Sequence, residues 1–174
     1  MNSTQSKGRF TSTGPLSKTE WNILWKSKIS PRHKNLLWKL AWDILPTKTT
    51  LAARIPSINT TCQLCNAEEE SALHIFTKCP ITQSIWLTSP WPIYLNRLPF
   101  TSSSDWVKFI LNPRTHLNLQ LSEAQSFTLL ACVICDQVWF HRNKMLKSGL
   151  STPPSNSPLP ISPPSPTPIL THAI

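Results

Sequence analysis

Three cysteines and one histidine lie within eighteen residues of each other: Cys62, Cys65, His74 and Cys79. A Cys-x2-Cys turn supplies two thiolates from one short loop, and a later His and Cys can complete the tetrahedral shell of a structural Zn²⁺ site. The alternative is a buried cysteine pair beside an unrelated histidine and cysteine. Because four suitable ligands at plausible spacing rarely coincide, we predict one closed site in which these residues bind Zn²⁺.

The backbone between His74 and Cys79 must allow both side chains to reach one metal. Residues five apart on an α-helix lie about 140° apart around its axis, too far to share a metal. We therefore predict that the helix carrying His74 ends before Cys79. Pro80 disfavours helical geometry at the preceding residue and can begin a new helix, so Cys79 should lie at a helix N-terminus, where the dipole favours its thiolate.

A longer pattern surrounds this cluster, over about residues 18–88. It consists of Trp25-Lys26, Lys28, Pro31, Lys34, Leu37-Trp38-Lys39-Leu40, Asp43, Leu45-Pro46-Thr47, Leu51, Arg54, Glu70-Ser71, Phe76 and Trp86, together with the four ligand candidates. The pattern resembles the zinc-binding domain of reverse transcriptases from plant non-LTR retroelements. By position, the resemblance implies that Cys62, Cys65, His74 and Cys79 are the metal ligands. The segment from Trp139 to Asn143 resembles a Trp-x-x-Arg-Asn stretch that follows the domain in the same elements.

The inventory of acidic residues argues against catalysis. In those retroelements the domain lies between a polymerase and, often, a ribonuclease H domain, and neither fits in 174 residues. A two-metal polymerase or nuclease also needs clustered carboxylates, whereas the cluster present, Glu68 to Glu70, lies beside the expected zinc. A closed four-ligand site leaves no open coordination position for a substrate. We expect a stand-alone fragment that is not an enzyme.

Positive charge is concentrated in the N-terminal third. The chain has a formal net charge of +9, and ten of its seventeen lysines and arginines lie in residues 1–54, against only Glu20 and Asp43. Such asymmetry favours a polyanionic partner, nucleic acid first and an anionic membrane surface second, although a merely solvated basic face is the alternative. No acidic residue lies between Lys26 and Ala41. The candidates for phosphate contacts are Lys26, Lys28, Arg32, Lys34 and Lys39.

Helix start and stop signals recur along the chain and predict a small all-helical fold. Ser17 with Glu20 has capping-box spacing, Ser30-Pro31 should begin a helix that runs to about Ile44, and Thr47 can cap a third helix. A short helix should begin near Ser71 and another at Pro80. Further on, Ser104 can cap a helix over 105–111, and Ser122 with Gln125 should start a long helix that ends at Gly149. In that long helix Phe127, Leu130, Ile134, Val138, His141 and Met145 recur at the spacing of one buried face.

Composition divides the chain into four segments. Residues 1–16 are a basic N-terminus with little to bury, and we expect them to be disordered. Residues 17–90 should form the zinc-binding domain, and residues 91–149 a helical extension packed on it. Residues 150–174 are rich in proline and serine, which favours a disordered tail.

Cys132, Cys135 and the tryptophans have a structural and a functional interpretation each. The two cysteines have metal-like spacing but lie in an apolar helical pattern, where free cysteine packs as a small hydrophobic residue. Exposed tryptophans among basic residues could stack on bases. Helical spacing instead predicts burial for Trp21, Trp25, Trp38, Trp42, Trp86 and Trp139, and leaves Trp91 and Trp106 as the candidates for exposure.

These observations predict a zinc-binding, non-catalytic module that binds RNA or DNA with little sequence preference. The alternative is a structural or protein-interaction remnant of a retroelement polyprotein, in which zinc only stabilises the fold. Metal-bound cysteines favour a reducing, intracellular compartment, and no apolar run is long enough to span a membrane.

Overall fold

The computed structural model describes residues 14–148, which contain helices and a single isolated β-bridge between Thr61 and Glu69. The elements in chain order are α1 (Lys18–Lys26), α2 (Pro31–Ala41), α3 (Lys48–Ala52), the π-helix η1 (His74–Lys78), α4 (Pro80–Leu87), the 3-10 helix η2 (Leu95–Arg97), α5 (Ser103–Leu111), α6 (Pro113–Leu117) and α7 (Leu121–Ser148). The predicted all-helical class is confirmed. Residues 1–13 and 149–174 lie outside the described residues. They include the whole tail expected at 150–174 and all but the last three residues of the N-terminal segment expected to be disordered.

The predicted caps of the first three helices are present. Ser17 Oγ accepts from the Glu20 N–H at 3.2 Å while Glu20 Oε2 accepts from the Ser17 N–H at 2.6 Å, which completes the capping box of α1. Ser30 caps α2 with Pro31 at the first helical position. Thr47 caps α3 through the N–H of Thr50. These short polar side chains satisfy N–H groups that have no partner inside the helix.

Other boundaries differ from the sequence expectation. α2 ends at Ala41 instead of near Ile44, because Asp43 adopts a left-handed conformation with φ 52° that a helix does not continue through. The cap of α5 is Ser102 and not Ser104, and its partner in the capping box is Asp105. α7 begins at Leu121, one residue before the expected cap at Ser122, and Glu123 Oε2 accepts from the N–H of Gln120 at 2.8 Å. α6 and η2 were not predicted.

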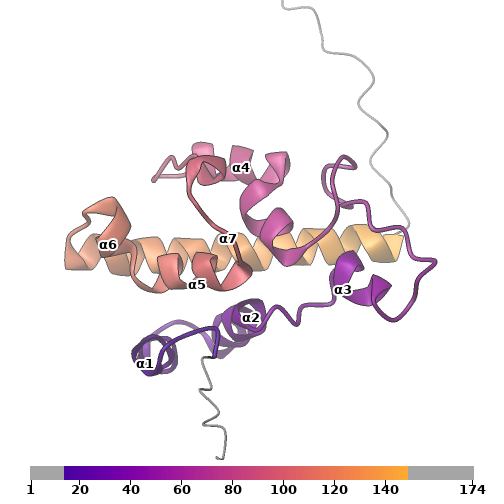
Figure 1. Cartoon of the computed structure of the whole chain (residues 1–174). Coiled ribbons are helices and arrows are strands. Elements are labelled where there is room, and N and C mark those ends of the chain that lie inside the picture. The colour runs from indigo at the N-terminus through magenta and orange to yellow at the C-terminus, as the bar shows by residue number, and fades with distance from the viewer. Residues whose placement is uncertain (1–13, 149–174) are drawn as a thin grey trace, which may run out of the picture.

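α7 is the longest helix and runs across the whole structure, with α4 on one side and α1 and α2 on the other (Figure 1). It contacts α2, α5, α6 and η1. No helix within residues 14–148 is long and apolar enough to cross a membrane.

One hydrophobic core joins the expected zinc-binding domain to the expected helical extension. Trp86 of α4 is fully buried and packs edge-on against Trp106 of α5 at 5.5 Å between ring centroids, and against Phe127 of α7 at 5.8 Å. Leu16, the last residue of the segment expected to be disordered, is also buried in this core. The apolar packing therefore crosses the boundary that composition placed near residue 90.

Trp86 is buried as predicted, but four other tryptophans are placed differently from the prediction. Trp106 is fully buried, although its nearness to a loop suggested exposure. Trp25, Trp38 and Trp42 are 51%, 36% and 48% exposed, although helical spacing suggested burial. Helical periodicity identifies residues on one side of a helix, but it does not identify which side faces the core. In α1 the buried residue is Leu24, and in α2 the buried face consists of Leu36, Leu37, Leu40 and Ala41.

Candidate metal centre

The structure brings Cys62, Cys65, His74 and Cys79 together. One ligand atom of each residue lies within 4.8 Å of every other, and Cys62, His74 and Cys79 are buried while Cys65 is partly exposed. In a tetrahedral site with Zn–S bonds of about 2.3 Å, neighbouring sulfurs are about 3.8 Å apart. The four side chains are thus gathered to nearly the dimensions that one such ion requires.

The first two ligands lie on a tight loop between α3 and η1. The Cys62 N–H donates to the Glu68 carbonyl at 2.7 Å, and the Asn66 N–H donates to the Cys62 carbonyl at 2.9 Å. Asn66 has φ 54°, in the left-handed region that asparagine tolerates better than most residues. This turn folds the chain back on itself and directs both thiols to the same side.

The π-helix η1 resolves the angular problem between His74 and Cys79. The Cys79 N–H donates to the His74 carbonyl at 2.7 Å, an i→i+5 bond that closes one wider turn. The wider turn brings residues five apart closer around the axis than the about 140° that separates them in an α-helix. As predicted, the helix ends before Cys79, and Cys79 is the N-cap of α4, which begins at Pro80.

The His74 imidazole is oriented by contacts on both ring nitrogens. Nε2 lies 3.3 Å from the Cys65 sulfur and so faces the cluster. Nδ1 lies 3.1 Å from Glu68 Oε2 on the opposite edge of the ring. A carboxylate on the outer nitrogen fixes the tautomer with the proton on Nδ1 and leaves Nε2 as the metal-binding nitrogen, the usual arrangement at metal-bound histidines.

Contacts among these four side chains, together with burial, shift the pKa values of Cys62, His74 and Cys79. A hydrogen bond with Cys79, followed by burial, raises the pKa of Cys62 to about 12, while the same hydrogen bond lowers the pKa of Cys79. Burial disfavours the charged form of His74, but hydrogen bonds to Cys62 and Cys65 outweigh it and raise its pKa to about 9. The cluster therefore holds shared protons that a metal cation would displace. These donors fit a metal ion that prefers thiolate and imidazole ligands.

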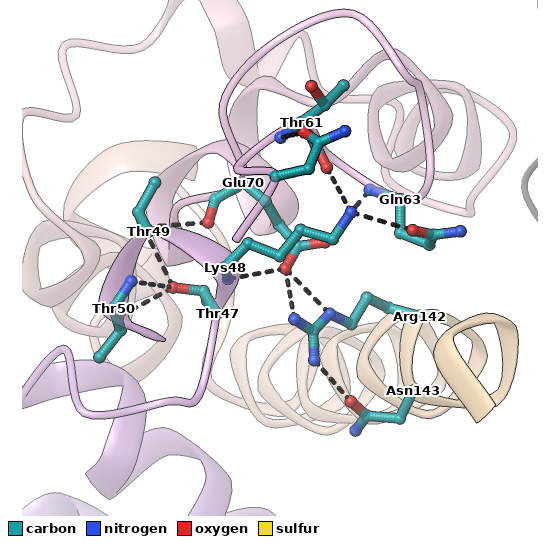
Figure 2. Close-up of polar contacts among 10 residues, drawn as sticks. Thr47, Lys48, Thr49, Thr50, Thr61, Gln63, Glu70, Arg142 and Asn143 are labelled. Atoms are coloured by element: carbon teal, nitrogen blue, oxygen red, sulfur yellow. Dashed lines mark hydrogen bonds and ion pairs between the residues drawn. The ribbon is translucent and has the colours of Figure 1, made fainter. Parts of the chain in front are cut away.

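A buried carboxylate, Glu70, ties the metal loop to two helices (Figure 2). Its Oε2 accepts from the Gln63 N–H at 3.1 Å, inside the Cys62–Cys65 loop, and its Oε1 accepts from the Lys48 N–H at 2.9 Å, at the start of α3. Oε1 also accepts from Nε and Nη2 of Arg142 on α7. Glu70 is 0% exposed and Arg142 2% exposed, so this ion pair is excluded from solvent.

The side chain of Lys48 adds two hydrogen bonds to the segment that carries Cys62. Its ammonium donates to the Thr61 carbonyl at 2.7 Å and to Gln63 Oε1 at 3.0 Å (Figure 2). Arg142 Nη1 donates to Asn143 Oδ1 at 2.8 Å, and its guanidinium lies 4.9 Å from the centroid of the Trp139 ring. The Glu70 and Trp139-to-Asn143 positions, which carried separate parts of the resemblance, therefore meet in one network.

Residues 5–86 match the family model described as zinc-binding in reverse transcriptase. The match covers 82 of the 174 residues, and this part of the chain is similar to that family. The predicted resemblance to a retroelement reverse transcriptase domain is thereby confirmed, and the matched domain is a zinc-binding one, not a catalytic one. The match ends at Trp86, within α4.

A protein of Arabidopsis thaliana named "Putative ribonuclease H protein" is 33% identical to this chain over 67 residues. The match covers 38% of this chain and 11% of the plant protein. The matched part of the chain thus spans about a ninth of the length of this curated relative. No solved structure matches the chain.

The five residues predicted to contact phosphates have different surroundings. Lys26 and Lys28 are exposed and line a groove of about 1050 Å³ with Arg114 of α6. Arg32 donates from Nε to Asp136 of α7 at 2.7 Å, so an acidic residue distant in sequence neutralises it. Lys34 donates from Nζ to the Trp25 carbonyl at 2.8 Å. The role of these residues stays a prediction, as does that of the half-buried Lys39.

Cys132 and Cys135 lie in the buried middle of α7, away from the metal cluster. Burial raises the pKa of the Cys132 thiol to about 12 and raises that of Cys135 as well. Among the residues that the structure describes, Cys62, Cys65, His74 and Cys79 make the one cluster suited to a metal, and it includes neither thiol. Their placement agrees with packing as small hydrophobic side chains.

The sequence did not indicate that Glu70 and Arg142 pair behind the metal loop, or that Asp136 pairs with Arg32. The predicted buried face of α7 included Phe127, Ile134 and Val138, which are buried, and His141, which is exposed. Arg142 and Asp136 are buried because each meets an oppositely charged partner more than seventy residues away. Such a pairing leaves no local periodicity, although the Trp-x-x-Arg-Asn stretch was a signal that could have indicated Arg142.

Proposed function

We propose that this protein is a structural zinc module that binds nucleic acid without catalysing a reaction. Zn²⁺ would be held by the sulfurs of Cys62, Cys65 and Cys79 and by His74 Nε2. Three thiolates and one imidazole suit Zn²⁺ better than Mg²⁺ or Ca²⁺, which prefer oxygen ligands. With four protein ligands the coordination shell is full, so the metal would supply folding free energy and not a reactive water.

The groove between α1, α6 and α7 is the observation that carries the nucleic-acid proposal. Lys26 and Lys28 approach it from the end of α1 and the loop that follows, and Arg114 approaches from α6. Within residues 14–148, no acidic side chain lines this groove. Three cations around a groove without acidic side chains suit the phosphate backbone of RNA or DNA. Such contacts would hold the strand without reading its sequence.

A salt titration with labelled RNA and DNA strands tests this function. Each phosphate contact contributes about 0.7 to 0.9 to the slope of log affinity against log salt. Lys26→Ala, Lys28→Ala and Arg114→Ala in combination should weaken binding and lower the slope by about two to three. The charge-matched control combines Arg97→Ala, Lys144→Ala and Lys147→Ala, all at exposed positions outside the groove.

The second candidate is the structural or protein-interaction remnant, favoured by the neutralisation of Arg32 by Asp136. In that case both triple variants should alter polyanion binding equally and weakly. Metal analysis is independent of this choice. Cys62→Ser and Cys79→Ser should each lose stoichiometric zinc, whereas Cys132→Ser should retain one ion per chain. Full zinc content in Cys79→Ser would show that the ligand assignment is wrong.

A further inference from the structure

Three tryptophans are stacked in a row across α1 and α2, and we call them the tryptophan stack: Trp25, Trp21 and Trp42. The ring centroids of Trp25 and Trp21 are 6.4 Å apart with an interplanar angle of 16°, and those of Trp21 and Trp42 are 6.4 Å apart at 19°. Trp25 is 51% and Trp42 is 48% exposed. Trp38, 36% exposed, lies one helical turn before Trp42.

Contiguous aromatic surface of this kind is unusual on a soluble protein. Burying an aromatic side chain stabilises a fold by a few kcal/mol, and Trp86 and Trp106 are placed accordingly in the core. In the tryptophan stack, by contrast, Trp25 and Trp42 are exposed, while Trp21 between them is partly buried against the core. Contiguous apolar side chains that stay exposed on a protein surface can mark a binding surface.

The charges around the stack determine what it can bind. Lys18 precedes Trp21 by three residues and shares its face of α1, and Lys34 places its ammonium against the Trp25 carbonyl at 2.8 Å. The neighbouring acids have partners within the protein. Glu20 is held in the capping box of α1, and Asp43 Oδ1 accepts from Ser103 Oγ at 3.3 Å. Parallel indole rings bordered by ammonium groups complement a chain that alternates flat aromatic groups with phosphates.

We propose that the tryptophan stack is a stacking platform for the unpaired bases of a single-stranded nucleic acid. Bases stack on aromatic rings regardless of their identity, so such a platform prefers single strands to duplexes without reading sequence. The stack points away from the Ile23 and Lys26 side of α1, which lines the basic groove. It is a contact separate from the groove, and the inference rests on the proposed nucleic-acid function because it names the form of nucleic acid bound.

Two probes of equal charge separate stacking from phosphate binding: a short oligothymidylate and an abasic deoxyribose-phosphate strand of the same length. The zinc-loaded full chain should bind the oligothymidylate at least about tenfold more tightly. Trp25→Ala with Trp42→Ala should remove this preference, leave affinity for the abasic strand unchanged and leave the salt slope unchanged. Trp25→Phe with Trp42→Phe should restore most of the preference, because phenyl rings also stack.

The matched control is Phe140→Ala, which removes a 49% exposed aromatic ring on α7 far along the chain from the stack. It should leave the preference intact. Equal affinity of the unaltered protein for the two strands would overturn the stacking inference while the proposed nucleic-acid function stands. Failure to bind either strand would overturn both. Concentration-dependent self-association that Trp25→Ala abolishes would show instead that the stack is an interface between copies of this chain.

Discussion

The orientation of the His74 ring depends on a partner side chain outside the cluster of metal-ligand candidates. Glu68 supplies that partner through Oε2 at 3.1 Å from Nδ1, on a carboxylate that is 67% exposed. A carboxylate in this position increases the electron density at Nε2 and restricts rotation of the ring. Its contribution is reduced here by solvent, since exposed ion pairs are screened.

Glu68→Gln should therefore weaken zinc binding by about tenfold, the low end of the effect of residues behind a metal ligand. The amide keeps the shape of the side chain but carries no charge. Competition for zinc with a chromophoric chelator measures the change. Glu69→Gln is the control, because the Glu69 side chain is also exposed and its carboxylate contacts Thr60 instead of the ligand. Equal losses in both variants would show a general charge effect and no specific role for Glu68.

At the scale of elements, local chemistry determined what could be predicted. The starts of α1, α2 and α3 follow from Ser17, Ser30 and Thr47, because a cap satisfies N–H groups within three residues of itself. The start of α4 follows from Pro80, because proline favours the first helical position. The four metal-ligand candidates were found for the same reason, since their spacing is local. The π-turn of η1 has no cap or composition signal and was not predicted; the need to bring His74 to Cys79 indicated only that the helix ends before Cys79.

What escaped prediction depends on contacts between distant elements. The exposed face of α1 and α2 could not be assigned from periodicity, because both faces of α2 carry apolar residues. An arginine is usually expected on the surface. Arg142 is buried because it pairs with Glu70, which is seventy-two residues away in the chain but adjacent in space. A buried pair of this kind is costly unless both partners are present.

The link between Glu70 and α7 should therefore be sensitive to loss of one partner. Arg142→Met removes the guanidinium and leaves a buried, uncompensated carboxylate next to the metal loop, which should destabilise the protein by about 3 to 5 kcal/mol. Adding Glu70→Gln should recover part of the loss, since no unpaired charge then remains. Denaturant unfolding of the zinc-loaded variants measures both. If the double variant is no more stable than Arg142→Met, the cost arises from lost packing of Arg142 and not from the unpaired charge.

At the scale of the whole molecule, the family match and the packing do not share a boundary. The match ends at Trp86, whereas the Trp86 ring is buried by Trp106 and Phe127 from the following helices. Arg142 adds a second link from α7 to the metal loop. The metal site is thus held by elements from both sides of residue 90.

A fragment of residues 14–90 should accordingly fail to fold cooperatively even with zinc, whereas residues 14–148 should unfold in one transition. Without α5 and α7 the fragment would expose Trp86 and leave Glu70 without its guanidinium partner, and a domain so small has little other core to replace them. Thermal unfolding followed by circular dichroism, with and without a chelator, distinguishes the two. The longer chain should lose its transition on chelation, because metal binding contributes to folding free energy. Cooperative unfolding of zinc-loaded 14–90 at a temperature close to that of 14–148 would instead show that the family domain is autonomous and that α5 to α7 form an appended unit.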